Sequence, residues 1–272
     1  MKLLQLSDIH MNHSLKTAVK WRKFLLKKIK PLDFDAFAIV GDIASNEQKD
    51  LKTFFAILRN IFPDKKVFFV LGNHDFWDYE SWVKGKYSQS LRDHLPATRK
   101  YTYDKMVEYH KELCLKYDLI HLDGTFEELS KNIVLMGFDG WYAYEPITND
   151  ATCMPIELRD HSFLRNKAHN DLNKILEIKE KYYEDDNVIK VCLTHFPSYT
   201  RNQQYRHMIA NENYLPFICD NFDFLLIGHS HKDEEWGFRG CEIINCGSDY
   251  DKPQAKLIDL ITKEVKTIKY SK

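Results

Sequence analysis

The sequence has no long apolar run and no excess of charge of one sign. None of its hydrophobic stretches approaches the ~20 residues that cross a bilayer. The first residues, 1–6, are too short and too soon followed by polar residues to form a signal peptide. The formal net charge is -1 over 272 residues, so global electrostatics favours neither a nucleic-acid nor a membrane partner. These absences predict a cytoplasmic protein. The length of 272 residues fits one large α/β domain or two small ones.

Cysteine is sparse and scattered. The six cysteines form no Cys-x-x-Cys pair, which excludes a zinc ribbon and a dithiol redox motif. Buried free thiols are therefore expected at all six positions. They are Cys114, Cys153, Cys192, Cys219, Cys241 and Cys246.

In the first third of the chain, short apolar runs alternate with segments whose apolar residues have helical spacing. Strands are predicted at residues 3–7, 36–40 and 66–71, and helices at 15–29 and 51–61. This order indicates right-handed parallel crossovers, with helices on a face of the sheet. The pattern resumes with strands at 188–193 and 222–227. Three further runs, at 241–244, 255–260 and 265–268, predict a second, largely antiparallel sheet.

The middle of the chain has weaker periodicity. Residues 100–116 and 162–183 are expected to form helices, and 133–136 a strand. Residues 76–99 are aromatic and polar without clear periodicity. We expect a single domain over residues 1–272, with a cap or insertion around 76–187.

Five short fragments with metal-ligating side chains follow the ends of apolar runs. The most specific is Gly72-Asn73-His74-Asp75, directly after the strand predicted at 66–71. The other four are Asp8-Ile9-His10, Gly41-Asp42, Thr194-His195 and Gly228-His229-Ser230-His231. In open α/β sheets, ligands bind at the carboxyl ends of the strands, so we expect these fragments to meet there.

The residue types in these fragments suit a pair of divalent cations. Two cations ~3.5–4 Å apart can share one hydroxide and clamp a phosphoryl group between them. Such a site needs a bridging carboxylate and several imidazole and carboxylate ligands from different strands. Seven residues meet that requirement: Asp8, His10, Asp42, Asn73, His195, His229 and His231.

Local backbone requirements are also readable near these ligands. Gly41, Gly72 and Gly228 each precede a predicted ligand, where a tight turn favours positive φ or a close backbone approach. If the segment 228–231 is extended, alternation sends both of its imidazoles to one side. One short segment could then serve both metals.

In this order, the fragments resemble the calcineurin-like metallophosphoesterase superfamily. The resemblance implies an α/β fold: a β-sandwich of two mixed sheets flanked by helices (αββα), with a helical and aromatic cap insertion. It also implies a metal-dependent phosphoesterase with two divalent ions, for which the ligands suit Mn, Fe or Zn.

The resemblance further implies a role for each motif residue. Asp8, His10 and His231 would hold the first metal, and Asn73, His195 and His229 the second. Asp42 would bridge the two metals. His74 would stabilise the phosphoryl oxygens or protonate the leaving oxygen, and Asp75 would orient the His74 ring.

One departure from the family pattern bears on the substrate. Phosphoprotein phosphatases of this superfamily continue the second fragment as Gly-Asp-x-x-Asp-Arg-Gly, but here Gly41-Asp42 is followed by Ile43-Ala44-Ser45-Asn46. The arginine that grips the phosphate is missing, which argues against a protein phosphatase. The pattern is more similar to the phosphodiesterase branch. We therefore expect hydrolysis of a small phosphodiester by a metal-bridging hydroxide.

Trp141 and Tyr142 are predicted substrate contacts, because they follow a strand end at Gly137-Phe138-Asp139-Gly140.

Three alternatives remain beside a small-molecule diesterase. A nuclease would want a basic groove, which a net charge of -1 does not favour. A phosphomonoesterase could use the same scaffold. A non-catalytic scaffold usually loses a ligand or the third-fragment histidine, and this chain keeps both.

Overall fold

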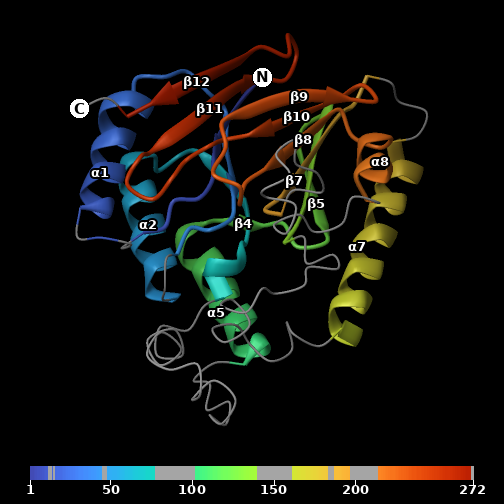
Figure 1. The fold of residues 1–272 in the computed structure, drawn as a ribbon, viewed down its shortest axis with the longest axis horizontal. Helices are drawn as coiled ribbons and strands as arrows, with labels where there is room; N and C mark the ends of the chain where they lie inside the picture. Colours follow the sequence, from blue (N-terminus) through green and yellow to red (C-terminus); the bar gives the residue numbers. More distant parts are fainter. Residues whose placement is uncertain are drawn as a thin grey trace.

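Two six-stranded sheets pack face to face, with helices on their outer sides (Figure 1). This computed structural model describes residues 1–11, 14, 16–44, 48–76, 102–139, 161–182, 187–196 and 214–270. Helices α1, α2 and α5 lie on one side of the sandwich and α7 and α8 on the other (Figure 1). The predicted fold class, a sandwich of two mixed sheets flanked by helices, is confirmed.

The first sheet has the strand order β12-β11-β1-β2-β3-β4. Its strands are β1 (Lys2–Leu6), β2 (Ala36–Val40), β3 (Lys66–Val70), β4 (Ile120–His121), β11 (Gln254–Asp259) and β12 (Val265–Lys269). Strands β1 to β4 run parallel, while β11 is antiparallel to β1 and β12 is antiparallel to β11. Strands β1, β2 and β3 are the strand-helix-strand repeat predicted from the apolar runs, and β4 was not predicted.

The second sheet has the order β5-β6-β7-β8-β10-β9. Its strands are β5 (Thr125–Ser130), β6 (Ile133–Phe138), β7 (Ile189–Thr194), β8 (Phe224–Ile227), β9 (Glu234–Phe238) and β10 (Cys241–Asn245). Strands β6, β7, β8 and β10 are parallel, and β5 and β9 are antiparallel edges.

The expectation that residues 241–268 form a second, largely antiparallel sheet is wrong. Strand β10 pairs in parallel with β8, whereas β11 and β12 extend the first sheet beside β1. The cause is that an apolar run shows which residues are buried but not which strand they pair with.

Four of the five described α-helices overlap predicted segments, whereas the short helix at 214–219 was not predicted. They are α1 (Thr17–Phe24), α2 (Gln48–Ile61), α5 (Tyr103–Tyr117), α7 (His161–Tyr182) and the short α8 (Tyr214–Cys219). The helix expected over 15–29 changes to a π-helix over Leu25–Ile29. No helix among the described residues is both long and apolar enough to span a bilayer.

The core between the sheets is mostly aliphatic, with Phe68 and Phe224 among its side chains, and comes from strands that face each other. Val40 and Val70 come from the first sheet, and Leu135, Leu193 and Leu226 from the second, all fully buried. Close packing of these short side chains brings the carboxyl ends of both parallel strand sets to one region. That region carries the predicted ligands.

The interval 76–187 contributes to both sheets where it is described. Residues 103–138 supply α5, β4, β5 and β6, and α7 follows. Residues 77–101 and 140–160 lie outside the described part of the chain, and Trp141 and Tyr142 with them. The single domain and its cap remain predictions.

Candidate metal centre

Five of the predicted ligands have a left-handed backbone. They are Asp8, His10, Asp42, His229 and His231, with φ between 45° and 65°. Such conformations cost of order 1–3 kcal/mol per residue and cluster at functional sites. Hydrogen bonds between loops hold two of them, since Asp8 N donates to Gly41 O (3.1 Å) and His10 N donates to Asp42 O (2.9 Å). The loop after β1 (the first loop) and the loop after β2 (the second loop) therefore support each other's strained geometry.

The three glycines meet the backbone requirement that the sequence predicted. Gly41 has φ 72°, and a Cβ there would overlap the ring of His195. Gly72 and Gly228 have ordinary φ, but a Cβ on Gly72 would lie 2.6 Å from Asp42 N, and one on Gly228 would lie 2.8 Å from a backbone carbonyl. Close approach, not φ, selects glycine at these two positions.

The predicted extended conformation of residues 228–231 is wrong. His229 and His231 both have positive φ, so they are not alternating residues of a strand. Both imidazoles nevertheless lie in the site. His231 belongs to one group of potential ligand atoms and His229 to another.

The first group is Asp8, His10 and His231, whose ligand atoms lie within 4.8 Å of one another. His231 Nε2 lies 3.6 Å from Asp8 Oδ1 and 3.4 Å from His10 Nε2. Asp8 Oδ1 also accepts the amide of His229 (3.0 Å). Asp8 Oδ2 is buried without a hydrogen-bond partner among the described residues. A divalent cation would satisfy that oxygen and the converging imidazole nitrogens, so the donor set fits a metal ion.

The second group is Asp42, His195 and His229. His195 Nε2 lies 3.3 Å from Asp42 Oδ2, while His195 Nδ1 lies 2.9 Å from the carbonyl of Val40. Because Nδ1 must donate its hydrogen to that carbonyl, the neutral ring has its lone pair on Nε2, facing the group. Asn73 is buried at the start of the 3-10 turn Asn73–Phe76.

Asp42 connects the two groups. Its Oδ2 lies 3.8 Å from His10 Nε2 as well as 3.3 Å from His195 Nε2. Its Oδ1 accepts the backbone amide of His74 (2.9 Å). One oxygen thus holds the loop after β3 (the third loop), and the other faces imidazoles of both groups.

Burial and charge set the protonation of these side chains. Burial lowers the pKa of His10 and His229 well below the usual range, so both rings are neutral and able to bind a cation. Burial raises the pKa of Asp8. Burial would also raise the pKa of Asp42, but His195 and His74 outweigh it and hold that pKa well below its ordinary value.

The pKa of His195 is raised, in contrast to those of His10 and His229. Burial lowers its pKa, but the charge of Asp42 and the hydrogen bond to it prevail and raise the pKa to about 9. Without a cation, His195 and Asp42 therefore form an ion pair at neutral pH. Binding a metal at His195 requires loss of its proton.

The third loop is fastened through its backbone. Asp75 is fully buried; its Oδ1 accepts the amide of Ala44 (2.7 Å) and its Oδ2 accepts that of Gly72 (2.8 Å). Burial and the charge of Asp42 raise the pKa of Asp75 to about 8. The His74 ring is edge-on to His10, with centroids 4.6 Å apart. The orienting role of Asp75 toward His74 remains a prediction beside these backbone contacts.

Two residues that the sequence did not indicate contact the first group. The ring of Tyr250 stacks on His10 at 4.5 Å and lies 5.2 Å from His231. Asp249 Oδ1 lies 3.4 Å from His231 Nδ1. Both come from the loop between β10 and β11, and Ser-Asp-Tyr-Asp-Lys there has no ligand spacing that could have identified them.

Asp139 is a further buried carboxylate near the site. Its Oδ1 accepts the amide of Leu71 (2.8 Å) and lies 3.1 Å from His121 Nε2. It therefore holds the end of β3 one residue before Gly72. The sequence indicates Asp139 only as part of a strand end.

Comparison with known proteins adds a family and a fold. Residues 1–233 match the sequence profile of the family described as calcineurin-like phosphoesterase. No curated protein sequence matches the chain. The solved structure of TT1561 of Thermus thermophilus is similar over 98% of both chains, at 15% identity and a TM-score of 0.61.

Two other solved structures are also similar. The phosphopantetheinyl hydrolase PptH of Mycobacterium tuberculosis has a TM-score of 0.61 at 14% identity, covering 92% of this chain and 90% of its own. A putative 5'-nucleotidase of Staphylococcus aureus has a TM-score of 0.53 at 13% identity, covering 98% of this chain and 52% of its own. At these identities the likeness shows the fold alone.

Proposed function

Because this chain belongs to the calcineurin-like phosphoesterase family, we propose that it hydrolyses small phosphodiesters at a centre of two divalent cations. Its His and Asp groups make it a metal-dependent phosphoesterase; the diester preference and the ligand assignment are the proposal. Mn, Fe and Zn all suit such mixed ligands.

The position of Asp42 Oδ2 carries the proposal of two cations. It lies between His10 Nε2 at 3.8 Å and His195 Nε2 at 3.3 Å, while the other oxygen is held by a backbone amide. In the proposed assignment Asp42 would bridge the cations. Asp8, His10 and His231 would hold the first, and Asn73, His195 and His229 would hold the second.

The residues of the chain would share the chemical work with the cations. When bound, the two cations supply Lewis acidity, charge neutralisation and a lowered pKa for a shared water. His74, beside His10 and Asp42, would stabilise the phosphoryl oxygens or give a proton to the leaving oxygen. Asp75 would keep His74 in place through the backbone of its loop.

The second loop supports a diester rather than a dianionic monoester. Ile43 and Ala44, which follow Asp42, are fully buried and apolar. Asn46 stands where the phosphoprotein-phosphatase pattern has the arginine that grips a second phosphate charge. A diester carries one negative charge and needs less cationic help.

Matched chromogenic esters test this proposal. We expect kcat/KM with saturating Mn to be at least about tenfold higher for bis-p-nitrophenyl phosphate than for p-nitrophenyl phosphate, which releases the same leaving group. A preference for the monoester would make the protein a phosphomonoesterase. Faster cleavage of single-stranded DNA than of the small diester would make it a nuclease.

A further inference from the structure

An apolar groove lies between the outer faces of α1, the π-helix 25–29 and α2. It has a volume of about 540 Å³ and an apolar lining of Ala18, Val19, Leu26, Ala56, Ile57 and Ile61. Val19 is 52% exposed and Leu26 is 40% exposed, which is high for side chains of this kind. None of these residues belongs to the metal centre, so the proposed hydrolysis gives them no role.

The helical segments that form this groove are strongly basic. Residues 16–30 and 48–61 contain ten lysines and arginines but one acidic residue, Asp50, which is buried. The whole chain is nearly balanced, with 39 basic and 40 acidic residues. Arg22 and Lys30 line the groove itself. These segments therefore carry a clear net positive charge although the whole chain is balanced.

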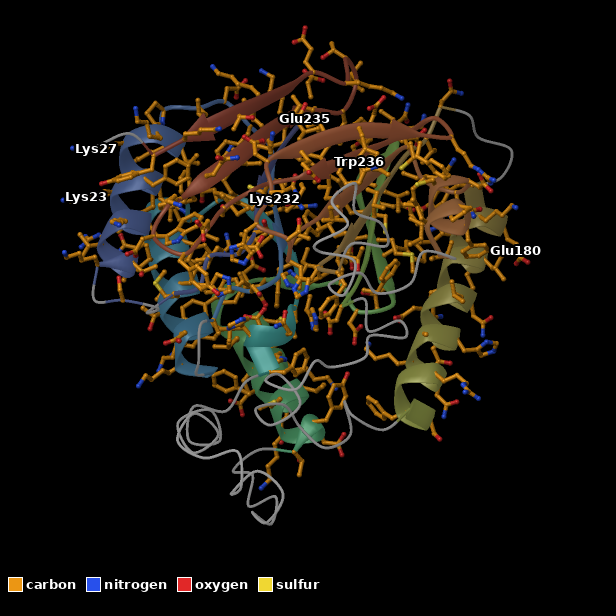
Figure 2. The ribbon with its side chains drawn as sticks, in the orientation of Figure 1. Lys23, Lys27, Glu180, Lys232, Glu235 and Trp236 are labelled. Carbon is orange, nitrogen blue, oxygen red and sulfur yellow. The ribbon has the colours of Figure 1, made fainter. Side chains whose placement is uncertain are left out.

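The cations on this face are available to a partner. Arg22, Lys23, Lys27 and Lys30 are exposed and have no ion pair with any described residue. Lys23 and Lys27 point outward from the edge of the molecule formed by α1 (Figure 2). Acidic side chains from another molecule could reach them without displacing an internal contact.

The backbone beside the groove is unusual. Residues Leu25–Ile29 form a π-helix, closed by a bond of 2.8 Å from Lys30 N to Leu25 O. π-Segments are rare and occur frequently at functional sites. Here Leu25 and Ile29 face the core while Leu26 faces the groove. The π-helix thus places Leu26 on the surface, whereas only Leu25 and Ile29 pack into the core.

We propose that this groove binds an acidic amphipathic helix of another protein. Apolar side chains at i, i+3, i+4 and i+7 of such a helix would enter the groove, and flanking Glu or Asp would meet Arg22, Lys23 and Lys30. The charge disfavours a second copy of the chain in the same groove, because that contact would place two basic faces together. The concave apolar floor fits a helix better than a flat bilayer or a nucleic-acid backbone.

A displayed library of 16-residue helices tests the proposal. The probe has Leu fixed at the four spaced positions and every other position random. Selection on the full-length protein should enrich acidic sequences, and a peptide of the enriched consensus should bind at least tenfold more weakly to Val19→Asp/Leu26→Asp and to Lys23→Glu/Lys27→Glu. Raising the salt concentration should also weaken binding of the consensus peptide to the wild-type protein, since the cations are exposed.

Leu115→Asp on α5 is the matched control, because Leu115 is 88% exposed and lies outside the groove. It should bind the consensus peptide like the wild type, and all variants should keep the wild-type Tm and diester hydrolysis. Three results would overturn the proposal: enrichment of neutral or basic sequences, equal binding to the groove variants, or no enrichment. Binding to anionic vesicles or self-association that the groove variants abolish, in the absence of peptide binding, would assign the face to a membrane or a second copy instead.

Discussion

Asp42 divides its two oxygens between the backbone and the imidazoles. Oδ1 accepts the amide of His74, and Oδ2 faces His10 and His195. The same side chain therefore positions the third loop and contacts both ligand groups. Asp75 instead uses both oxygens for backbone amides, from Ala44 in the loop after β2 and from Gly72 in the loop after β3. Single carboxylates thus fix the geometry between loops that are distant in sequence.

His74→Ala should separate binding of the metals from catalysis. We expect the variant to keep both cations but to lose ~10²–10⁴ in turnover, because a charge stabiliser or proton donor is removed. The loss should be smaller for esters with acidic leaving groups. Elemental analysis and single-turnover rates measure the two effects. If the variant loses a cation, His74 is a ligand, which its place in a group with His10 and Asp42 would then explain.

Asp249→Asn should weaken one cation only. Asp249 Oδ1, 3.4 Å from His231 Nδ1, holds the ring with Nε2 toward Asp8. Outer carboxylates of this kind typically contribute 10- to 100-fold to metal affinity, so we expect a loss of about that size for the first site. Mn binding measured by calorimetry should show the second site unchanged. Asp220→Asn, which breaks a surface pair with Arg239, is the control; equal losses in both variants would refute the role.

At the scale of elements, the strands and their following loops were the most predictable part. Buried parallel strands are short continuous apolar runs, so 36–40 was predicted with its observed ends. The proposed ligands after each strand were predicted from residue type and order, and their metal binding stays a prediction. Strand β5 was missed because its residues 125–130 are only partly buried or exposed and show no apolar run. The pairing of β11 with β1 depends on contacts about 250 residues apart, which local pattern does not encode.

The loop from β10 to β11 could not be predicted for a related reason. Tyr250 and Asp249 reach the site because β11 returns beside β1, whose end leads to Asp8. Their residue types are ordinary for a turn. Only the tertiary placement gives them contact with His10 and His231.

Helix α7 carries a buried carboxylic acid, Asp171, whose effect on the free energy of unfolding should depend on pH. Burial raises the pKa of Asp171 to about 7, and its Oδ2 has no hydrogen-bond partner among the described residues. In the unfolded chain the carboxyl ionises near pH 4. The folded state therefore resists ionisation, and the destabilisation grows from pH 4 to pH 7 and is complete above pH 7.

Asp171→Asn should remove this penalty. We expect the variant to match the wild type in Tm near pH 4 and to exceed it at pH 8, by up to about 4 kcal/mol in the free energy of unfolding. Thermal unfolding across this pH range measures the difference. A gain that does not vary with pH would mean that Asp171 is not the titrating group.

At the scale of the whole molecule, the centre depends on both sheets. Asp8, Asp42 and Asn73 follow strands of the first sheet, while His195 and His229 follow strands of the second. Direct bonds join the sheets near these ends. Buried Gln5 on β1 donates to the carbonyls of Ile227 (3.1 Å) and Ile244 (3.2 Å). The relative position of the two ligand sets is thus fixed by the packing of the sandwich.

Further links between the sheets use charge. Lys256 on β11 has a fully buried side chain and pairs with Asp233 and with Glu235 of the second sheet. Burial lowers the pKa of Lys256, but these carboxylates outweigh it and raise the pKa. Asp233 lies two residues after His231, so this pair holds the chain just beyond the first ligand group.

We propose that hydrolysis depends on two cations, which Asp42 would bridge. Titration of the metal-free protein with Mn, with bound Mn per chain and bis-p-nitrophenyl phosphate hydrolysis measured on the same samples, tests it most directly. We predict two bound Mn, hydrolysis that rises as the second site fills, and loss of both sites in Asp42→Ala. Full hydrolysis with one Mn per chain, or two Mn retained by Asp42→Ala, would contradict the account.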